Sequence, residues 1–248
     1  MNFYFVFEGK TEPMVYQFWF KQLFRNLITE VNDYQDVENN NYYYVSDMGV
    51  PDCYNAVANA IQDINEVPKY DYLVLFIDAD RYSAEERIAE AHQRIFERLN
   101  DRKKAYLYKD LPSNCHLEII VQHVCIETWF LGNRKFFVRN PQTELLKKYI
   151  DYFDVSMNNP EDLAHEFIQS EDGTREIFGY RTKALFHEAY FRAIFKERMK
   201  GVAYHKSKPR EVPSEPYFNQ LLKRIQANPK HLASFQNMLL FFRQVPNK

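Results

Sequence analysis

Short runs of continuously apolar residues alternate with amphipathic segments through the first half of the chain, and this alternation restricts the fold more than any other feature. Such runs are typical of strands buried on both faces of a parallel sheet. We expect four strands, at residues 2–7, 42–45, 72–77 and 117–125. We expect helices at residues 12–29, 52–65, 83–99 and 126–131. Strands that alternate with helices form right-handed crossovers, so the pattern predicts an α/β fold with a mostly parallel sheet.

The amphipathic pattern also predicts which side of each helix is buried. In the first helix the apolar face is wide, and its members are Val15, Phe18, Trp19, Leu23, Leu27 and Ile28. The helix at 83–99 has a narrower apolar stripe, and Ser83 is a typical N-cap residue for it. Thr11 is the corresponding N-cap candidate for the first helix, with Pro13 in its first turn.

Strands are not expected after residue 131. The sequence pattern of residues 141–199 predicts helices that are interrupted near Asn158-Asn159-Pro160 and Gly173. Two more helices are expected at about 217–227 and 230–243. The chain therefore divides, on this interpretation, into an α/β domain at 1–135 and a helical region at 136–248.

Composition narrows the class of protein. The chain has 248 residues, of which 46% are hydrophobic and 17% aromatic, enough for a sizeable aromatic-rich core. Its three cysteines, Cys53, Cys115 and Cys125, are scattered and form no CxxC pair, which favours reduced thiols over disulfides or structural zinc. The N-terminal segment lacks a basic region before its apolar run, and no stretch approaches the roughly 18–20 apolar residues of a membrane span. We therefore expect a cytoplasmic protein that does not enter a membrane.

The net charge of −2 conceals an uneven distribution. Residues 1–180 carry 18 Lys and Arg against 30 Asp and Glu, whereas residues 181–248 carry 14 against 4. A basic C-terminal third suits a protein that binds the phosphates of nucleic acid. A basic helical face that is solvated, or docked on the acidic part, explains the charges equally well.

Carboxylates follow two of the predicted strands. Glu8 comes directly after the first strand, and Asp78 and Asp80 come directly after the third. Ligands of a parallel sheet collect at the carboxyl ends of its strands, and residues i and i+2 of an extended segment point the same way. Three converging carboxylates repel one another unless a cation such as Mg²⁺ lies between them. The alternative is structural: Asp80 closes a turn, and Glu8 pairs with Lys10 or accepts backbone N–H groups.

These residues resemble a known family. The segments Phe7-Glu8-Gly9-Lys10-Thr11-Glu12 and Phe76-Ile77-Asp78-Ala79-Asp80 are similar to the two acidic motifs of TOPRIM domains, and most similar to those of the OLD and RloB-like branch. Ile126–Leu131, Tyr204-His205-Lys206 and the segment around Ala233-Ser234-Phe235 fit the same branch more loosely. The glycine turn of the family corresponds to Asp47-Met48-Gly49, which has only one glycine.

The resemblance implies a TOPRIM-like fold and a role for each matching residue. Glu8 would be a metal ligand or general base, and Asp78 and Asp80 the metal-binding pair, for one or two Mg²⁺ or Mn²⁺ ions. Glu127 would serve a second metal position, although in its apolar surroundings a Lys or Arg partner would satisfy it as well. Lys206 would reach the scissile phosphate, or else belong to an exposed, solvated basic loop.

The function expected from the acidic residues and the resemblance is metal-dependent cleavage of DNA or of RNA, including tRNA. The resemblance alone implies that the protein is the effector of an anti-phage defence or toxin-type system. A topoisomerase tyrosine domain, a primase zinc module and a P-loop are absent from the sequence, so any ATPase partner would be a separate chain. An exposed sheet edge would allow a homodimer. Two alternatives remain: a metal-dependent nucleotide phosphotransferase, and a catalytically silent module that docks on a partner ATPase.

Overall fold

The sheet of the protein is five-stranded and parallel. The computed structural model describes residues 1–25, 27–46, 49–101, 109–163 and 180–245. Its strands are β1 (Phe3–Phe7), β2 (Thr29–Glu30), β3 (Asn41–Val45), β4 (Tyr72–Asp78) and β5 (His116–Gln122). They lie in the order β2-β3-β1-β4-β5. The predicted α/β class and mostly parallel sheet are therefore confirmed.

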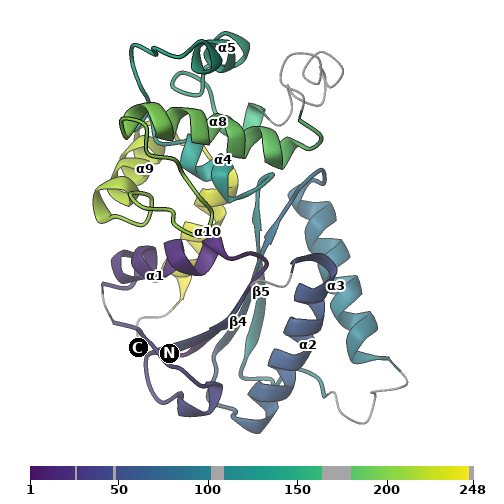
Figure 1. The fold of residues 1–248 in the computed structure, drawn as a ribbon. Helices are drawn as coiled ribbons and strands as arrows, with labels where there is room; N and C mark the ends of the chain where they lie inside the picture. The colour runs from purple at the N-terminus through teal and green to yellow at the C-terminus, as the bar shows by residue number, and fades with distance from the viewer. Residues whose placement is uncertain (26, 47–48, 102–108, 164–179, 246–248) are drawn as a thin grey trace. The chain divides into compact units, whose positions relative to one another are not determined.

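Residues 1–77, 83–121 and 240–248 form one compact unit, unit 1, which holds most of the sheet. Its helices are α1 (Thr11–Leu23), α2 (Gly49–Glu66) and α3 (Ala84–Leu99). In Figure 1, α2 and α3 lie on one face of the sheet and α1 lies on the other. The strand β1 is buried on both faces because alternate side chains meet each layer: Phe5 stacks on Phe20 of α1 at 4.6 Å between ring centroids. On the opposite face, the hydroxyl of Tyr4 donates to Asp63 of α2 over 2.7 Å.

The first helix is shorter than predicted, and part of its predicted face is wrong. It ends at Leu23, and Arg25 beyond it has a φ of 50°, a left-handed conformation that cannot continue a helix. Phe18 is 49% exposed and Leu27 is 54% exposed. The buried face instead follows the i, i+3, i+4 spacing of Val15, Tyr16, Trp19 and Phe20. Lys10, rather than Thr11, occupies the N-cap position.

The third helix begins as the sequence predicts. The hydroxyl of Ser83 accepts the N–H of Glu86, and the Glu86 carboxylate accepts the N–H of Ser83, which forms a complete capping box. By contrast, β2 was not predicted. Its two residues, Thr29 and Glu30, are both exposed and pair with Asn41 and Tyr42 of β3. A short 3₁₀ turn at Tyr34–Asp36 also interrupts the polar segment between β2 and β3.

The second compact unit, unit 2, consists of residues 78–82 and 122–239. The predicted domain boundary at 135/136 falls inside it. The helices that begin here are α4 (Ile126–Leu131), α5 (Glu144–Tyr152), α8 (Lys183–Arg198), α9 (Glu215–Ala227) and α10 (Ala233–Gln244), whose last residues belong to unit 1. The predicted interruption at Gly173 lies outside the described residues. None of the described helices is long and apolar enough to cross a membrane.

Two of the sequence segments discussed above pack together in the core of unit 2. The indole N–H of Trp129, in α4, donates to the hydroxyl of Ser234 over 2.7 Å. The ring of Trp129 also lies 5.0 Å from that of Phe235, measured between centroids. The Glu127-Thr128-Trp129 segment is thus held in place by the first turn of α10.

The strand order contains one reversal of direction. From β1 the chain passes through α1 toward β2 and β3, whereas from β4 it passes through α3 toward β5. The neighbouring strands β1 and β4 are therefore the topological switch point of the sheet, where open α/β folds bind their ligands beyond the carboxyl ends of the strands. Phe7 pairs with Phe76, and the N–H of Glu8 donates to the carbonyl of Phe76, so both strands end at the same edge.

Candidate active site

The three carboxylates predicted as metal ligands follow the two strands of the switch point. Glu8 is the first residue after β1 and is half-buried. Asp78 is the last residue of β4 and is also half-buried, whereas Asp80 is exposed. Glu8 belongs to unit 1, and both aspartates belong to unit 2.

The argument that Asp78 and Asp80 share one face of an extended segment fails at Asp80. The strand ends at Asp78, and Asp80 has a φ of 53°. Its N–H donates to the carbonyl of Val124, and a turn follows in which the N–H of Tyr82 donates to the carbonyl of Ala79. Aspartate tolerates this left-handed conformation better than most residues. Asp80 therefore does form part of a turn, as the structural alternative stated.

Glu8 lies beside the beginning of α2 in unit 1. Its carbonyl accepts the N–H of Gly49, where α2 starts. The carboxylate of the buried Glu12 lies over Gly9: a β-carbon at residue 9 would be 2.8 Å from an oxygen of Glu12, so glycine leaves room for it. Burial raises the pKa of the Cys53 thiol to about 12; the negative charge of Glu8 adds to this shift, and the positive charge of Arg87 opposes it.

Glu127, by contrast, lies in a fully enclosed position in unit 2. Its side chain is 0% exposed. The hydroxyl of Tyr204 donates to its Oε1 over 2.9 Å, and the Nζ of Lys206 is 3.8 Å from the same oxygen. Its Oε2 is buried and has no hydrogen-bond partner among the described residues. A carboxylate with one oxygen left unpaired in an apolar interior is costly, which makes this group a candidate for a functional role.

Lys206 connects two acidic side chains. It lies in a tight turn closed by the N–H of Lys208, which donates to the carbonyl of His205. Its Nζ is 3.5 Å from Glu188 of α8 as well as 3.8 Å from Glu127. Its side chain is 46% exposed.

The electrostatic surroundings of Lys206 favour its charged form. Burial alone would lower the pKa of Lys206, but the negative charges of Glu127 and Glu188 outweigh this effect, with a smaller contribution from Asp78, and raise the pKa above its ordinary value. Two of the predicted site residues, Asp78 and Glu127, thus act on the same ammonium group. Lys206 thus pairs with buried carboxylates, while the basic turn around it is exposed, as the alternative of a solvated loop expected.

Tyr204 supplies the only hydroxyl that donates to Glu127 among the described residues. We expect Tyr204→Phe to lower the free energy of unfolding by about 1.5 kcal/mol or more, because a hydrogen bond to a charged group contributes more than one between neutral groups. Tyr217→Phe is the matched control, since its buried hydroxyl donates to the neutral carbonyl of Phe130 over 2.7 Å. Denaturant unfolding checks this prediction; equal losses in the two variants would contradict it.

A buried histidine lies beside the Glu127 segment. His187 of α8 is 0% exposed, and its Nδ1 is 2.8 Å from the hydroxyl oxygen of Thr128. Burial lowers the pKa of His187 to about 3, with smaller contributions from His123 and Lys183. The imidazole is therefore neutral in the folded protein at neutral pH.

This shift predicts how stability depends on pH. Because the pKa is lower in the folded protein (about 3) than in the unfolded chain (6.5), the unfolded state binds more protons between these pH values. The stabilisation that comes from burying the neutral imidazole is therefore fully present above pH 6.5. It is lost as the pH falls from 6.5 toward 3. We expect the wild type to lose about 2 kcal/mol more than His187→Gln between pH 7 and pH 5. Denaturant unfolding at both pH values, with the exposed His92→Gln as control, checks this; parallel losses in wild type and His187→Gln would refute it.

Cys125 is a core residue. It is 0% exposed, and its thiol contacts the hydroxyl of Thr128 and the carbonyl of Ala184 at 3.9 Å. Burial, reinforced by the negative charges of Glu127 and Asp78, raises the pKa of this thiol well above its ordinary value. Thiolate chemistry at neutral pH is therefore not expected from it.

The predicted residues are thus brought together only in part. Within unit 2, Lys206 pairs with Glu127, and the charge of Asp78 acts more weakly on Lys206. The sequence did not identify Tyr204 and Glu188 as partners of this pair. The signal for Glu188 was its position among buried aromatic residues of α8, where a charged side chain needs a partner. In the part of the chain that the structure describes, no group of three or more His, Cys, Asp or Glu side chains is arranged to hold a metal ion.

Comparison with known proteins adds no relative. No protein-family model, no curated protein and no solved structure matches this chain. Its function is therefore inferred from its own residues.

Proposed function

We propose that the chain is a TOPRIM-type nuclease that cleaves DNA or RNA with the help of Mg²⁺ or Mn²⁺. The observation that carries this proposal is the position of the acidic residues. Glu8 follows β1 and Asp78 ends β4, the two neighbouring strands at which the sheet reverses its winding. Ligand sites of open parallel sheets form beyond such strand ends, and carboxylates there suit a hard cation better than an uncharged substrate.

The donor set supports a magnesium-type ion. Glu8, Asp78 and Asp80 would offer an ion only oxygen atoms, which Mg²⁺ and Mn²⁺ prefer. Because no three of the described acidic side chains are arranged round one ion, they would have to draw together when the ion binds. When bound, one or two such ions would polarise the phosphodiester and lower the pKa of an attacking water. The role of the three carboxylates is to hold and orient the ions, and Glu8 is in addition the candidate general base.

Lys206 supplies positive charge to the same region. Its side chain is half exposed, and the charge of Asp78 acts on its ammonium group. We assign to Lys206 the stabilisation of negative charge on the phosphate or the leaving oxygen. Glu127 and Glu188 are then the residues that position Lys206, and Tyr204 positions Glu127.

The basic C-terminal third supports nucleic acid as the substrate. Residues 181–248 carry 14 Lys and Arg against 4 Asp and Glu, and such an excess attracts a phosphate backbone over long range. We further propose, on the resemblance to the OLD and RloB-like branch, that the protein is the effector of an anti-phage defence system. Because the sequence has no P-loop, its ATPase would be a separate subunit. A homodimer through a sheet edge is compatible with this arrangement.

The proposal is tested by incubating the protein with plasmid, single-stranded DNA and total RNA in the presence of Mg²⁺, Mn²⁺ or EDTA. We expect cleavage of at least one polymer with either metal and none with EDTA. Free nucleoside triphosphates are included as a fourth substrate, because their metal-dependent consumption without polymer cleavage would identify a phosphotransferase instead. Absence of all metal-dependent turnover, with or without a partner ATPase, would contradict the proposal.

A further inference from the structure

Unit 2 contains a cavity that the proposed active site does not use. Its volume is about 560 Å³, within the range of pockets that bind small organic molecules. The loop that follows α4, the helix α5 and the turn after α5 form its walls. The described lining residues are Arg134, Lys135, Phe137, Arg139, Pro141, Ile150, Asp154 and Ser156.

The charges that line this cavity are unbalanced. Three basic side chains face one carboxylate, that of Asp154. The Asp154 carboxylate accepts the N–H of Ser156 over 2.8 Å, and among the described residues it forms no ion pair with the three cations. A cavity wall with more positive than negative groups favours an anionic ligand.

Arg134 is short of acceptors in the described part of the chain. Its guanidinium contacts only the sulfur of Met157 there, at 3.7 Å, and sulfur is a weak acceptor. A second guanidinium, that of Arg224 in α9, is close enough to affect it: burial lowers the pKa of Arg224, and the charge of Arg134 lowers it further. The Nε of Arg224 is buried and has no hydrogen-bond partner among the described residues. The positive charges of Arg134 and Arg224 therefore act on each other, and a phosphate bound by Arg134 would reduce this repulsion.

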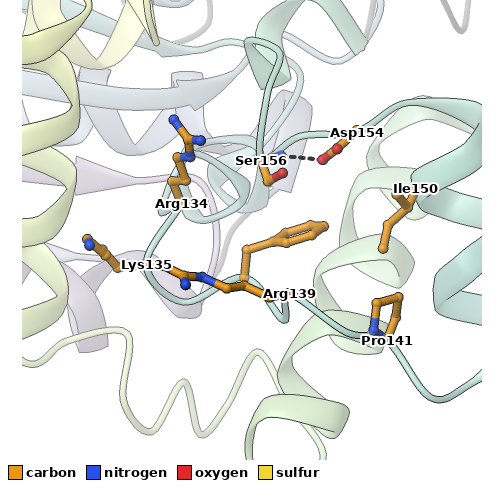
Figure 2. A pocket seen from close by; sticks show the side chains of 8 residues that line it. Arg134, Lys135, Arg139, Pro141, Ile150, Asp154 and Ser156 are labelled. Carbon is orange, nitrogen blue, oxygen red and sulfur yellow. Dashed lines mark hydrogen bonds between the residues drawn. The ribbon is translucent and has the colours of Figure 1, made fainter.

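Apart from Ser156, the uncharged lining residues are apolar, and one of them is aromatic. Phe136 is buried against Phe191, Phe195 and Tyr217. Its neighbour Phe137 is half-buried, lines the cavity and makes no ring contact with the described aromatic residues. Figure 2 shows the basic side chains on one side of the cavity and Pro141 and Ile150 on the other. The cavity thus combines donors for an anion with an apolar wall and a ring suited to stacking.

We infer that this cavity binds a nucleoside 5′-phosphate, with the phosphate held by Arg134 and Arg139 and the base against Phe137. Stacking of a base on an aromatic side chain and charge-assisted hydrogen bonds to phosphate are the two interactions that nucleotide recognition needs. The ligand is either a free nucleotide or the terminal nucleotide of a nucleic-acid strand, since both present the same chemistry. The inference does not depend on metal-dependent cleavage, because no proposed metal ligand lines the cavity.

The test is calorimetric titration in EDTA, which excludes any contribution from a metal site. The probes are adenosine 5′-monophosphate, adenosine and inorganic phosphate. We expect the monophosphate to bind, adenosine to bind more weakly, and Arg139→Ala to weaken binding of the monophosphate about tenfold. Phe137→Leu should weaken binding of the monophosphate but leave that of inorganic phosphate unchanged. Arg139 is exposed, so its substitution is not expected to disturb folding.

Lys148→Ala is the matched control, because Lys148 is an exposed basic residue of α5 outside the cavity. It should bind the monophosphate like the wild type. Oligonucleotides with a 5′-phosphate or a 5′-hydroxyl distinguish the two sources of ligand. If the wild type binds the 5′-phosphorylated strand more tightly than the monophosphate, and Arg139→Ala loses this tighter binding, the ligand is a strand end. Tighter binding of the monophosphate identifies a free nucleotide. Equal affinities of Arg139→Ala and Lys148→Ala for the monophosphate would overturn the inference. So would the absence of binding to the wild type, at about 1 mM, of both the monophosphate and the 5′-phosphorylated strand.

Discussion

Replacing Asp78 by Asn is expected to lower metal-dependent cleavage about a thousandfold or more. The substitution keeps the size of a half-buried side chain at the end of β4 but removes the negative charge that an ion requires. Glu8→Gln should have the same effect, because Glu8 is the carboxylate that follows the neighbouring strand. Initial rates on the substrate identified above measure both losses.

The loss of activity should not reflect unfolding. Removing one of the carboxylates that are proposed to converge on the ion should leave thermal stability in EDTA equal to that of the wild type or higher. Glu85→Gln is the matched control, since Glu85 is exposed in the first turn of α3 and the substitution removes the same charge. Cleavage by Asp78→Asn or Glu8→Gln at the rate of Glu85→Gln would remove the proposed metal site.

Replacing Lys206 by Met is expected to lower the free energy of unfolding by about 2 to 3 kcal/mol. The substitution leaves the fully buried Glu127 without the cation that lies 3.8 Å from its Oε1. Breaking a completely buried pair costs about 3–5 kcal/mol, and the loss is smaller here because water reaches the half-exposed Lys206. Denaturant unfolding measures the change, and cleavage should be lost in the same variant.

Two further variants show whether the loss in Lys206→Met comes from the Glu127–Lys206 pair or from the removal of any lysine in this turn. Lys208→Met removes an exposed lysine of the same turn that forms no ion pair with the described carboxylates, and should cost little. The double variant Glu127→Gln/Lys206→Met should be more stable than Lys206→Met alone, because a buried amide does not need a cation. A loss in Lys206→Met no greater than in Lys208→Met would show that Glu127 does not depend on this partner.

The elements that the sequence predicted well are those that local chemistry determines. The run Phe3–Phe7 is apolar at every position, and only a strand covered on both faces satisfies such a pattern. The start of α3 is equally local, because Ser83 and Glu86 form the capping box between themselves. For the same reason Glu8 and Asp78 were recognised as residues at the ends of strands.

Elements that depend on distant partners were missed. Nothing in Thr29 and Glu30 indicates a strand, because both side chains are exposed and only pairing with β3 makes them one. The end of α1 was placed too late, because apolar residues continue beyond the left-handed Arg25. The turn at Asp80 depends on a hydrogen bond to Val124, which belongs to the segment after β5.

The candidate site shows the same limit. The sequence indicated that Glu127 needs a partner, because it stands in an apolar run, but not which residue supplies it. The structure brings Tyr204 and Lys206 to it from a turn after α8, and Glu188 from α8 itself. Such contacts depend on how α4 and α8 pack, which periodicity alone does not determine.

The most direct test of the proposed function is a calorimetric titration of the protein with Mn²⁺, compared with Asp78→Asn and Glu85→Gln. The proposal predicts that the wild type and Glu85→Gln bind one or two ions with the same affinity, and that Asp78→Asn loses at least one of them. Equal binding in all three proteins, or no binding in the wild type, would contradict a metal site at the ends of β1 and β4.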